Sequence, residues 1–286
     1  MKHSHGFALV PTAVAGLAVA LLFPTVSRAQ NGTNPNYVPE VEQQKTTNQQ
    51  LEQRSLEKTQ NQVPKVDPQE EVAYKAFYDS NPQDSDTRIK LGEAFVQKYP
   101  TSRYVEAVYA GLTHAYYAKQ DWKNFYASGD KALALNPDDP AVLVIIGWVI
   151  PHTVNPSDPN ASNDLEKSEK YEKHAIEVIG LMAKPASMTD EQFSQTKATL
   201  LAQAHSGLGL AYFRRQRSED SAKELQQATQ GAGTPDPTDF YVLGLDLQSL
   251  SRFNEAADAF NRCGQIPGAL QDQCKQRADA VKKQAR

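Results

Sequence analysis

The chain has 286 residues, of which 40% are hydrophobic and 22% charged, and its formal net charge is −4 at pH 7. This composition excludes a collagen-like chain, a wholly disordered chain and a protein with many membrane spans. The acidic balance argues against nucleic acid as the main partner, because phosphate binding needs clustered lysine and arginine. Two cysteines are too few for a disulfide-dense scaffold or a zinc site with four thiolates.

Residues 1–29 have the features of a secretory signal peptide. Lys2 gives a positive start, an apolar run occupies residues 7–23, and Ser27-Arg28-Ala29 has the small–x–small pattern of a cleavage site. The alternative is an uncleaved membrane anchor, but the run has only 17 residues and contains a proline. We expect cleavage after Ala29 and a periplasmic or secreted protein, which contacts a membrane only if the signal is retained.

Residues 30–66 differ in composition from the rest of the chain. Thirteen of these 37 residues are Gln or Asn, and four acids balance four bases. Such a segment buries too little apolar surface to offset the entropy of ordering it, and its apolar residues are too few for a coiled-coil seam. We interpret it as a disordered spacer. Without the signal peptide, 28 basic and 34 acidic residues remain, a net charge of −6 that modestly favours a basic partner.

The remaining residues, 67–286, predict an all-α domain. Apolar positions recur there at helical spacing, and no stretch alternates with period two for long enough to indicate a strand. Turn-forming clusters interrupt the pattern at residues 81–82, 99–102, 136–140, 231–237 and 266–268. Thr189 and Gln192 have the spacing of a capping box at the start of a long helix.

Two stretches of this domain repeat at an offset of 35 residues. The first runs from Leu208-Gly209 to Ala228 and the second from Leu243-Gly244 to Cys263, with matching small and large residues between. This pattern resembles the tetratricopeptide repeat (TPR) family, whose helix–turn–helix units span roughly 34 residues. The segment 95–122 is also similar to units of exported TPR proteins of the bacterial cell envelope, so the resemblance implies an envelope location.

The resemblance implies a right-handed α-solenoid of about five degenerate TPR-like helical pairs and a C-terminal capping helix. We place the pairs at about 68–100, 103–137, 140–185, 189–230 and 237–265, and the cap at 268–284. In the second pair Phe125 and Gly129 invert the family's order of small and large residues, which puts the packing of its two helices in doubt. In the third pair an insertion, residues 151–164, separates the first helix from the second.

No pattern in the sequence indicates an enzyme, a cofactor or a metal centre. The histidines lack metal-binding spacing, and the Ser206-Gly207-Leu208-Gly209 stretch lacks the strand that a cofactor loop needs. The residues from Asp158 to Glu169 approach the spacing of a calcium loop, although Asn163 replaces the required glycine. We interpret this stretch as an Asx-rich loop that caps the helix starting near Leu165, and calcium binding stays an alternative.

In an oxidising compartment Cys263 and Cys274, eleven residues apart, are expected to pair. The bond would hold the capping helix against the last pair. The alternative is two separately buried thiols.

The first helices of successive TPR units line a concave groove that binds peptides or partner helices. The resemblance implies that the groove presents mainly aromatic side chains, namely His114, Tyr117, Trp148, Phe213, Arg214, Tyr241 and Gln248. We therefore expect a non-enzymatic exported adaptor that binds a protein or peptide partner in the cell envelope. The alternatives are a structural or self-associating envelope protein, and an enzyme or calcium-dependent module built on the insertion.

Overall fold

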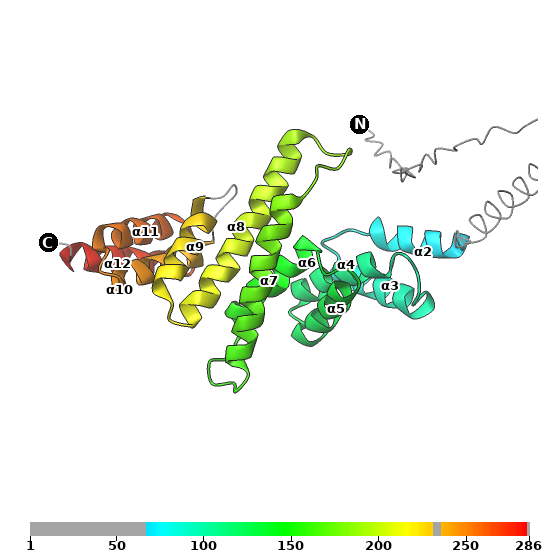
Figure 1. The fold of residues 1–286 in the computed structure, drawn as a ribbon, viewed down its shortest axis with the longest axis horizontal. Helices are drawn as coiled ribbons and strands as arrows, with labels where there is room; N and C mark the ends of the chain where they lie inside the picture. Colours follow the sequence, from blue (N-terminus) through cyan, green and yellow to red (C-terminus); the bar gives the residue numbers. More distant parts are fainter. Residues whose placement is uncertain (1–66, 231–235, 285–286) are drawn as a thin grey trace, which may run out of the picture. The chain divides into compact units, whose positions relative to one another are not determined.

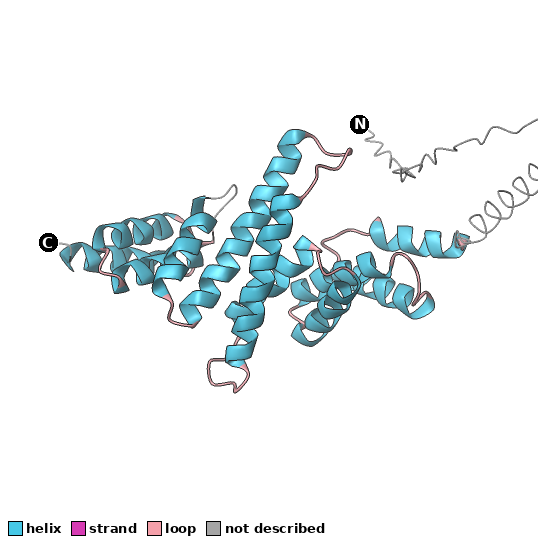
Figure 2. Ribbon diagram, in the orientation of Figure 1, coloured by secondary structure: helices cyan, strands magenta, loops and turns pink. Residues whose placement is uncertain are grey.

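The computed structural model describes residues 67–230 and 236–284, so the expected signal peptide and spacer lie outside the described residues. This part of the chain contains eleven α-helices and no strand (Figures 1 and 2). The helices are α2 (Pro68–Tyr78), α3 (Ser85–Lys98), α4 (Val105–Lys119), α5 (Trp122–Leu135), α6 (Pro140–Thr153), α7 (Ala161–Leu181), α8 (Asp190–Arg214), α9 (Ser218–Gln230), α10 (Pro237–Ser249), α11 (Phe253–Gln265) and α12 (Gln271–Gln284). None of these helices is both long and apolar enough to cross a membrane.

The helices follow one another as five consecutive pairs, from α2–α3 to α10–α11. The last four pairs pack closely, helix against helix, and α12 packs on α11 as a closing helix, whereas α2 reaches α3 through side chains, with Phe77 close to Gly92. The prediction of an all-α array of about five pairs with a cap is therefore confirmed. Aspartates begin several helices, since Asp84, Asp121, Asp139 and Asp236 each accept a backbone N–H of the helix that follows. Asp139 and Asp236 lie in predicted turns.

The 35-residue repeat reflects close contacts between the two helices of a pair. A Cβ atom added at Gly209 would lie 2.7 Å from the Leu225 side chain, and one added at Gly244 would lie 2.7 Å from Phe260. Both large side chains are fully buried. The glycines therefore let the first helix approach the second closely enough for Leu225 and Phe260 to fill the space between them.

The second pair packs normally despite its inverted order of small and large residues. Phe125 is fully buried, and Gly129 lies against Ile146 of α6 and Thr113 of α4. Phe125 therefore packs between α4 and α5, and Gly129 leaves room for Ile146 of α6 to pack closely against α5. The doubt about the contact between α4 and α5 is thus removed, since these helices pack along their length.

The predicted insertion is shorter than expected, because Pro151 lies inside α6 and only residues 154–160 separate α6 from α7. Proline lacks the N–H that would bond to the carbonyl oxygen of Gly147 four residues earlier. The Ser168 hydroxyl of α7 donates to that oxygen instead, at 2.7 Å, and is itself buried. A side chain on the next helix therefore compensates for the proline and lets α6 continue by another turn.

The calcium-loop alternative is not supported by the backbone of this segment. Residues from Ala161 onward belong to α7, so alternate side chains of the expected loop point in different directions around a helix. Asp158 accepts the backbone N–H of Asn160 at 2.8 Å, as in an ordinary Asx turn. No group of three or more His, Cys, Asp or Glu residues within 67–230 and 236–284 is arranged to hold a metal ion.

The fourth pair opens with the long helix expected there, and α7 and α8 form a hairpin longer than the others (Figure 1). Both bonds of the predicted capping box are present: Gln192 N–H donates to Thr189 Oγ1 at 3.1 Å, and Thr189 N–H donates to Gln192 Oε1 at 3.0 Å. Leu181 at the far end of α7 is 80% exposed.

Two apolar clusters meet along α8. One cluster of buried side chains extends from Phe77 to Ala204, and the other starts at Leu210 and ends at Val281. Between them lies a set of buried polar side chains that we call the polar seam: Ser168, Glu172, Ser206 and Asp239.

Glu172 occupies the centre of the polar seam. Its carboxyl group is fully buried, has no hydrogen-bond partner in the described structure, and fits against Gly147 of α6 and Gly207 of α8. Burial raises the pKa of Glu172 well above its ordinary value, because the charged form loses its hydration. Burial therefore favours the protonated form of this side chain.

We predict that Ser168→Ala lowers the free energy of unfolding by about 1–3 kcal/mol, because it leaves the Gly147 carbonyl oxygen buried and unpaired. Urea denaturation of the purified protein measures this loss. In a Pro151→Ala background, the restored N–H at position 151 donates to Gly147, so the same serine substitution should cost less. Equal losses in both backgrounds would contradict the compensation.

We also predict that Gly207→Ala destabilises the protein by about 1–3 kcal/mol, because the added methyl group overlaps the Glu172 carboxyl and lies 2.9 Å from the Trp148 Cα atom. Gly180→Ala is the matched control, since an added Cβ there meets nothing within 4 Å. The control should be neutral or gain up to about 1 kcal/mol from helix propensity. Thermal unfolding compares the two, and equal effects would show that the contact at Gly207 is loose.

Candidate partner-binding face

The first helices of the last four pairs lie next to one another in series. α4 contacts α6, α6 contacts α8 and α8 contacts α10, with the most extensive contact between α6 and α8. We call the surface that these four helices present the inner face. A series of neighbouring helices offers a continuous surface on which a partner segment could lie across several repeats.

Aromatic side chains gather on the inner face around Trp148 of α6. The Trp148 ring lies 6.3 Å from the Tyr117 ring of α4, edge to face, and 3.9 Å from the His152 ring one turn along its own helix. All three side chains are partly buried and keep some exposed surface. Rigid aromatic side chains held in this way provide large contact area at little entropic cost on binding.

A chain of hydrogen bonds fixes Trp148 across three first helices. The indole Nε1–H donates to Ser206 Oγ of α8 at 3.1 Å, and the Ser206 hydroxyl donates to Asp239 Oδ1 of α10 at 2.7 Å. Burial raises the pKa of Asp239 to about 7, although its bond from Ser206 favours the charged form. The orientation of the tryptophan therefore depends on two buried polar groups of the polar seam.

His152 and Arg214 extend this cluster at the end of α6. The Nδ1–H of neutral His152 donates to the Trp148 carbonyl oxygen at 2.7 Å, and burial lowers the pKa of the ring. Its Nε2 atom is buried and has no partner in the described structure. The Arg214 side chain is exposed, and its Nε–H donates to the Pro151 carbonyl oxygen at 3.1 Å. This bond ties the end of α8 to the last turn of α6.

His114 lies on α4, one helical turn before Tyr117, and more than a third of its surface is accessible. Surrounding protein atoms nevertheless lower its pKa through loss of hydration, and Arg88 adds to this, whereas Asp139 opposes it. In its neutral form this ring offers both a donor and an acceptor.

Three of the expected groove residues have other contacts. Phe213 packs against the C-terminal apolar cluster. The Tyr241 ring lies 5.8 Å from Phe260, and its hydroxyl accepts a bond from Gln273 Nε2 at 2.7 Å. Gln248 donates to Gln284 Oε1 at 3.0 Å. Since Gln273 and Gln284 belong to α12, the closing helix engages both α10 residues.

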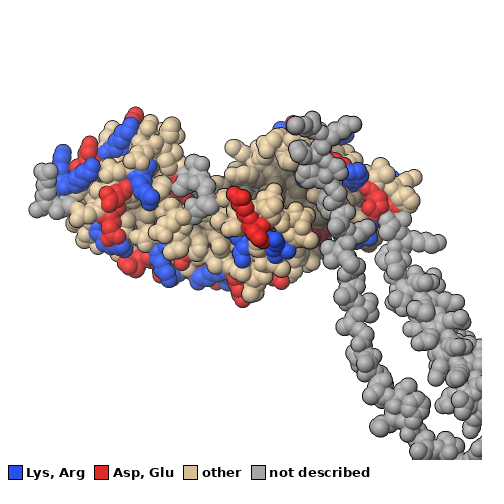
Figure 3. All heavy atoms as spheres, turned by 90° about the horizontal axis from the view of Figure 1, so that it is seen from above, with Lys and Arg blue, Asp and Glu red and all other residues tan. Residues whose placement is uncertain are grey.

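The structure therefore brings Tyr117, Trp148 and Arg214 toward one region of the inner face and places Tyr241 and Gln248 beside the cap. Ser206, Asp239 and His152 complete this region and were not expected from the sequence. The sequence does not single these residues out, because a serine, an aspartate at a helix start and a histidine after a tryptophan are all common. Figure 3 shows a hollow on one face of the domain with uncharged side chains inside it and charged side chains around it.

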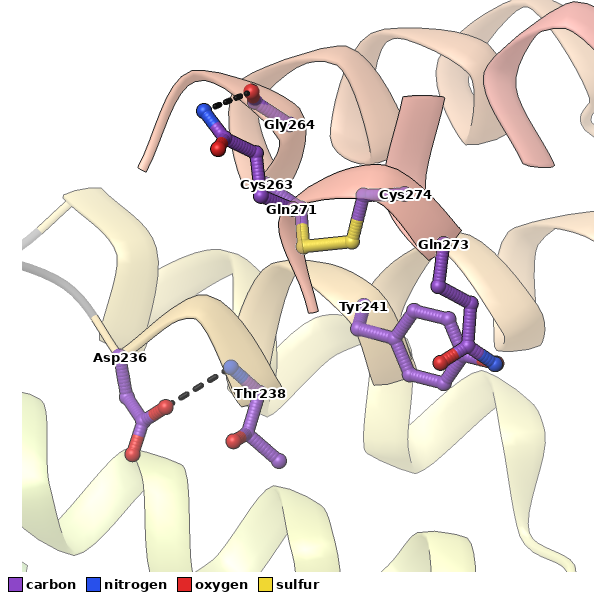
Figure 4. The surroundings of a disulfide bond; sticks show 8 residues. All are labelled: Asp236, Thr238, Tyr241, Cys263, Gly264, Gln271, Gln273 and Cys274. Carbon is purple, nitrogen blue, oxygen red and sulfur yellow. Dashed lines mark hydrogen bonds between the residues drawn. A yellow bond between two sulfur atoms is a disulfide. The ribbon is translucent and has the colours of Figure 1, made fainter. Parts of the chain in front are cut away.

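The two cysteines form a disulfide bond in the structure, with Cα atoms 5.8 Å apart (Figure 4). Cys263 lies in the last turn of α11 and Cys274 in the first half of α12, and both are fully buried. Gln271 of the same helix donates to the Gly264 carbonyl oxygen at 3.3 Å. The bond therefore attaches the closing helix covalently to the last pair.

No protein-family model matches the chain, and no curated protein matches it. The solved structures that align with it include TTC0263, a thermophilic TPR protein of Thermus thermophilus, yeast Tom70, and a double mutant of MamA RS-1. Their sequence identities are 17%, 15% and 13%, and their TM-scores 0.45, 0.47 and 0.40. The alignments cover 70%, 74% and 75% of this chain and 91%, 39% and 93% of the respective structures. Since all three TM-scores are below 0.5, the fold is assigned from this chain's own helices.

We predict that Asp239→Asn removes part of the pH dependence of stability. Because the folded pKa, about 7, lies above the ordinary 3.8, the folded protein binds the proton more tightly, and its stability falls as pH rises from about 4 to 7. Asparagine keeps an acceptor for Ser206 and carries no charge. The variant should be more stable than the parent by on the order of 1–3 kcal/mol at pH 8 and closer to it at pH 4.

Thermal unfolding between pH 4 and 8 measures this difference, with Asp258→Asn, an exposed acid of α11, as the control. A constant difference between Asp239→Asn and the parent across this range would show that Asp239 titrates like an exposed aspartate.

Proposed function

We propose that this protein is an exported, non-enzymatic adaptor of the TPR kind, and that its inner face binds a segment of another cell-envelope protein. The observation that carries the proposal is the fixed aromatic cluster of Tyr117, Trp148 and His152, which is partly exposed on a continuous layer of first helices. Aromatic anchors of this kind are enriched at the centres of protein interfaces.

Export is supported by two features of different kinds. The sequence begins with an apolar run and a cleavage pattern, and the folded domain carries a disulfide bond between Cys263 and Cys274. Disulfides persist in oxidising compartments and are rare in the reducing cytosol. Both features fit a protein that folds after it has crossed a membrane.

A photo-crosslinking amino acid at position 117 tests the binding surface in intact cells. A crosslinker placed there should capture one envelope protein, and Trp148→Ala should reduce that capture at least several-fold, because the anchor of the interface is lost. A crosslinker at Tyr78, an exposed aromatic residue of α2 outside the inner face, is the matched control and should not capture the same protein.

Thermal unfolding of Trp148→Ala must show that the variant is folded, so that lost capture reflects the lost anchor. Adducts formed only between copies of this chain would favour the self-associating alternative. A protein that stays in the cytosol, or one whose intact mass does not change by two daltons on reduction, would contradict export.

A further inference from the structure

A cavity of about 400 Å³ lies at the edge of the inner face, where α5, the end of α6 and the start of α7 meet the loop of residues 154–160. Trp122 and Tyr126 of α5 line one side, Ile150 and Val154 another, and the carboxyl-bearing residues Asp158 and Asp164 stand at the loop and on the first turn of α7. Its size is in the range of sites that hold a side chain or a small ligand. The cavity combines apolar and aromatic walls with acidic groups.

The charge of this cavity is not balanced by the chain itself. The one lysine at its edge, Lys167, is paired with Asp130 at 3.0 Å and stacks over the Tyr171 ring. Asp158 uses one oxygen to accept the Asn160 N–H, and within the described residues neither Asp158 nor Asp164 has a cationic partner. Burial raises the pKa of the Tyr126 phenol, and the charges of Asp164 and Asp130 add to this, whereas the charge of Lys167 opposes it. The cavity therefore presents a negative potential beside two aromatic rings.

A neighbouring cavity of about 360 Å³ shares Val154 and carries the opposite charge. Arg214 and Arg215 line it, together with apolar side chains of the loop and α7. Arg215 is paired with Glu169, so Arg214 carries the charge of this second cavity that has no acidic partner among the described residues.

We propose that the cavity at Trp122 binds the side chain of an arginine on a partner protein. A guanidinium group stacks on aromatic rings and donates to carboxylates, and the lining supplies both kinds of group, Trp122 and Tyr126 together with Asp158 and Asp164. The arginine's methylene groups would cover Ile150 and Val154. A divalent metal ion fits less well, because calcium requires six to eight oxygen ligands and only two carboxylates line the cavity.

This contact adjoins the inner face, since the Trp122 ring lies 6.2 Å from the Tyr117 ring. Its lining includes none of Tyr117, Trp148 and His152, and it goes beyond the function proposed above. It predicts a partner segment with an arginine, and it holds whether or not Trp148 anchors that partner. Its test therefore uses small probes and the purified mature protein, so that failure here leaves the crosslinking experiment unaffected.

N-acetyl-arginine amide is the probe, and its matched control is N-acetyl-citrulline amide, which has nearly the same shape and no charge. The protein has two tryptophans, so Trp148→Phe leaves Trp122 as the only indole fluorophore. The arginine probe should change the Trp122 emission with a dissociation constant on the order of millimolar, because the probe is small. The citrulline probe should bind at least several-fold more weakly, and added salt should weaken the arginine probe.

Asp158→Asn and Asp164→Asn should each weaken binding of the arginine probe several-fold. Glu177→Gln, an equal change of charge on an exposed residue farther along α7, should leave it unchanged. Equal binding of arginine and citrulline probes, equal binding by all three variants, or displacement of the arginine probe by micromolar calcium would each overturn the proposal.

Discussion

The close approach of α6, α7 and α8 is the constraint on which the rest of this array depends. Gly147 and Gly207 leave room on two neighbouring first helices, and the Glu172 carboxyl fills that room from the second helix between them. A buried acid without a hydrogen-bond partner is costly, and burial raises the pKa of Glu172, which favours the uncharged form that such an enclosed site tolerates best. Ser168 acts at the same junction, since its hydroxyl satisfies the carbonyl that Pro151 leaves unpaired. Side chains of one helix, α7, thus set how α6 and α8 meet.

The same junction links stability to the candidate binding surface. Ser206 stands next to Gly207 in the chain, and its hydroxyl connects the Trp148 indole to the Asp239 carboxyl. A change in the spacing of α6 and α8 would therefore move the tryptophan as well as the core. Burying the polar groups of the polar seam costs free energy, and their hydrogen bonds hold the Trp148 side chain on the inner face in a defined orientation. Apolar residues at these positions would pack well, but they would not hold an indole N–H.

The order and pairing of the helices could be predicted from the sequence because small and large residues recur in it at fixed spacing. Gly209 with Leu225 and Gly244 with Phe260 are local signals, and each contact lies within one pair. The end of α6 could not be predicted, because its proline is compensated by Ser168 on another helix.

For the same reason the candidate surface was predicted only in part. Trp148 and Tyr117 stand out as aromatic residues, whereas the roles of Ser206, Asp239 and Glu172 arise from tertiary contacts among α6, α7, α8 and α10. Tyr241 and Gln248 have the expected register, but the closing helix covers that part of α10.

The disulfide between α11 and α12 makes the two ends of the array differ in how they are held. In a chain of helical pairs each pair is stabilised by its neighbours, so the terminal pairs, which have one neighbour only, open most readily. Here one terminus is closed by a covalent bond between its last two helices. The other terminus begins with α2, an eleven-residue helix held by noncovalent contacts such as the stacking of Tyr74 on Tyr104, with ring centroids 3.9 Å apart. Within the described residues, the two ends of the array therefore differ in kind: the cap is held covalently, and α2 is held by noncovalent contacts.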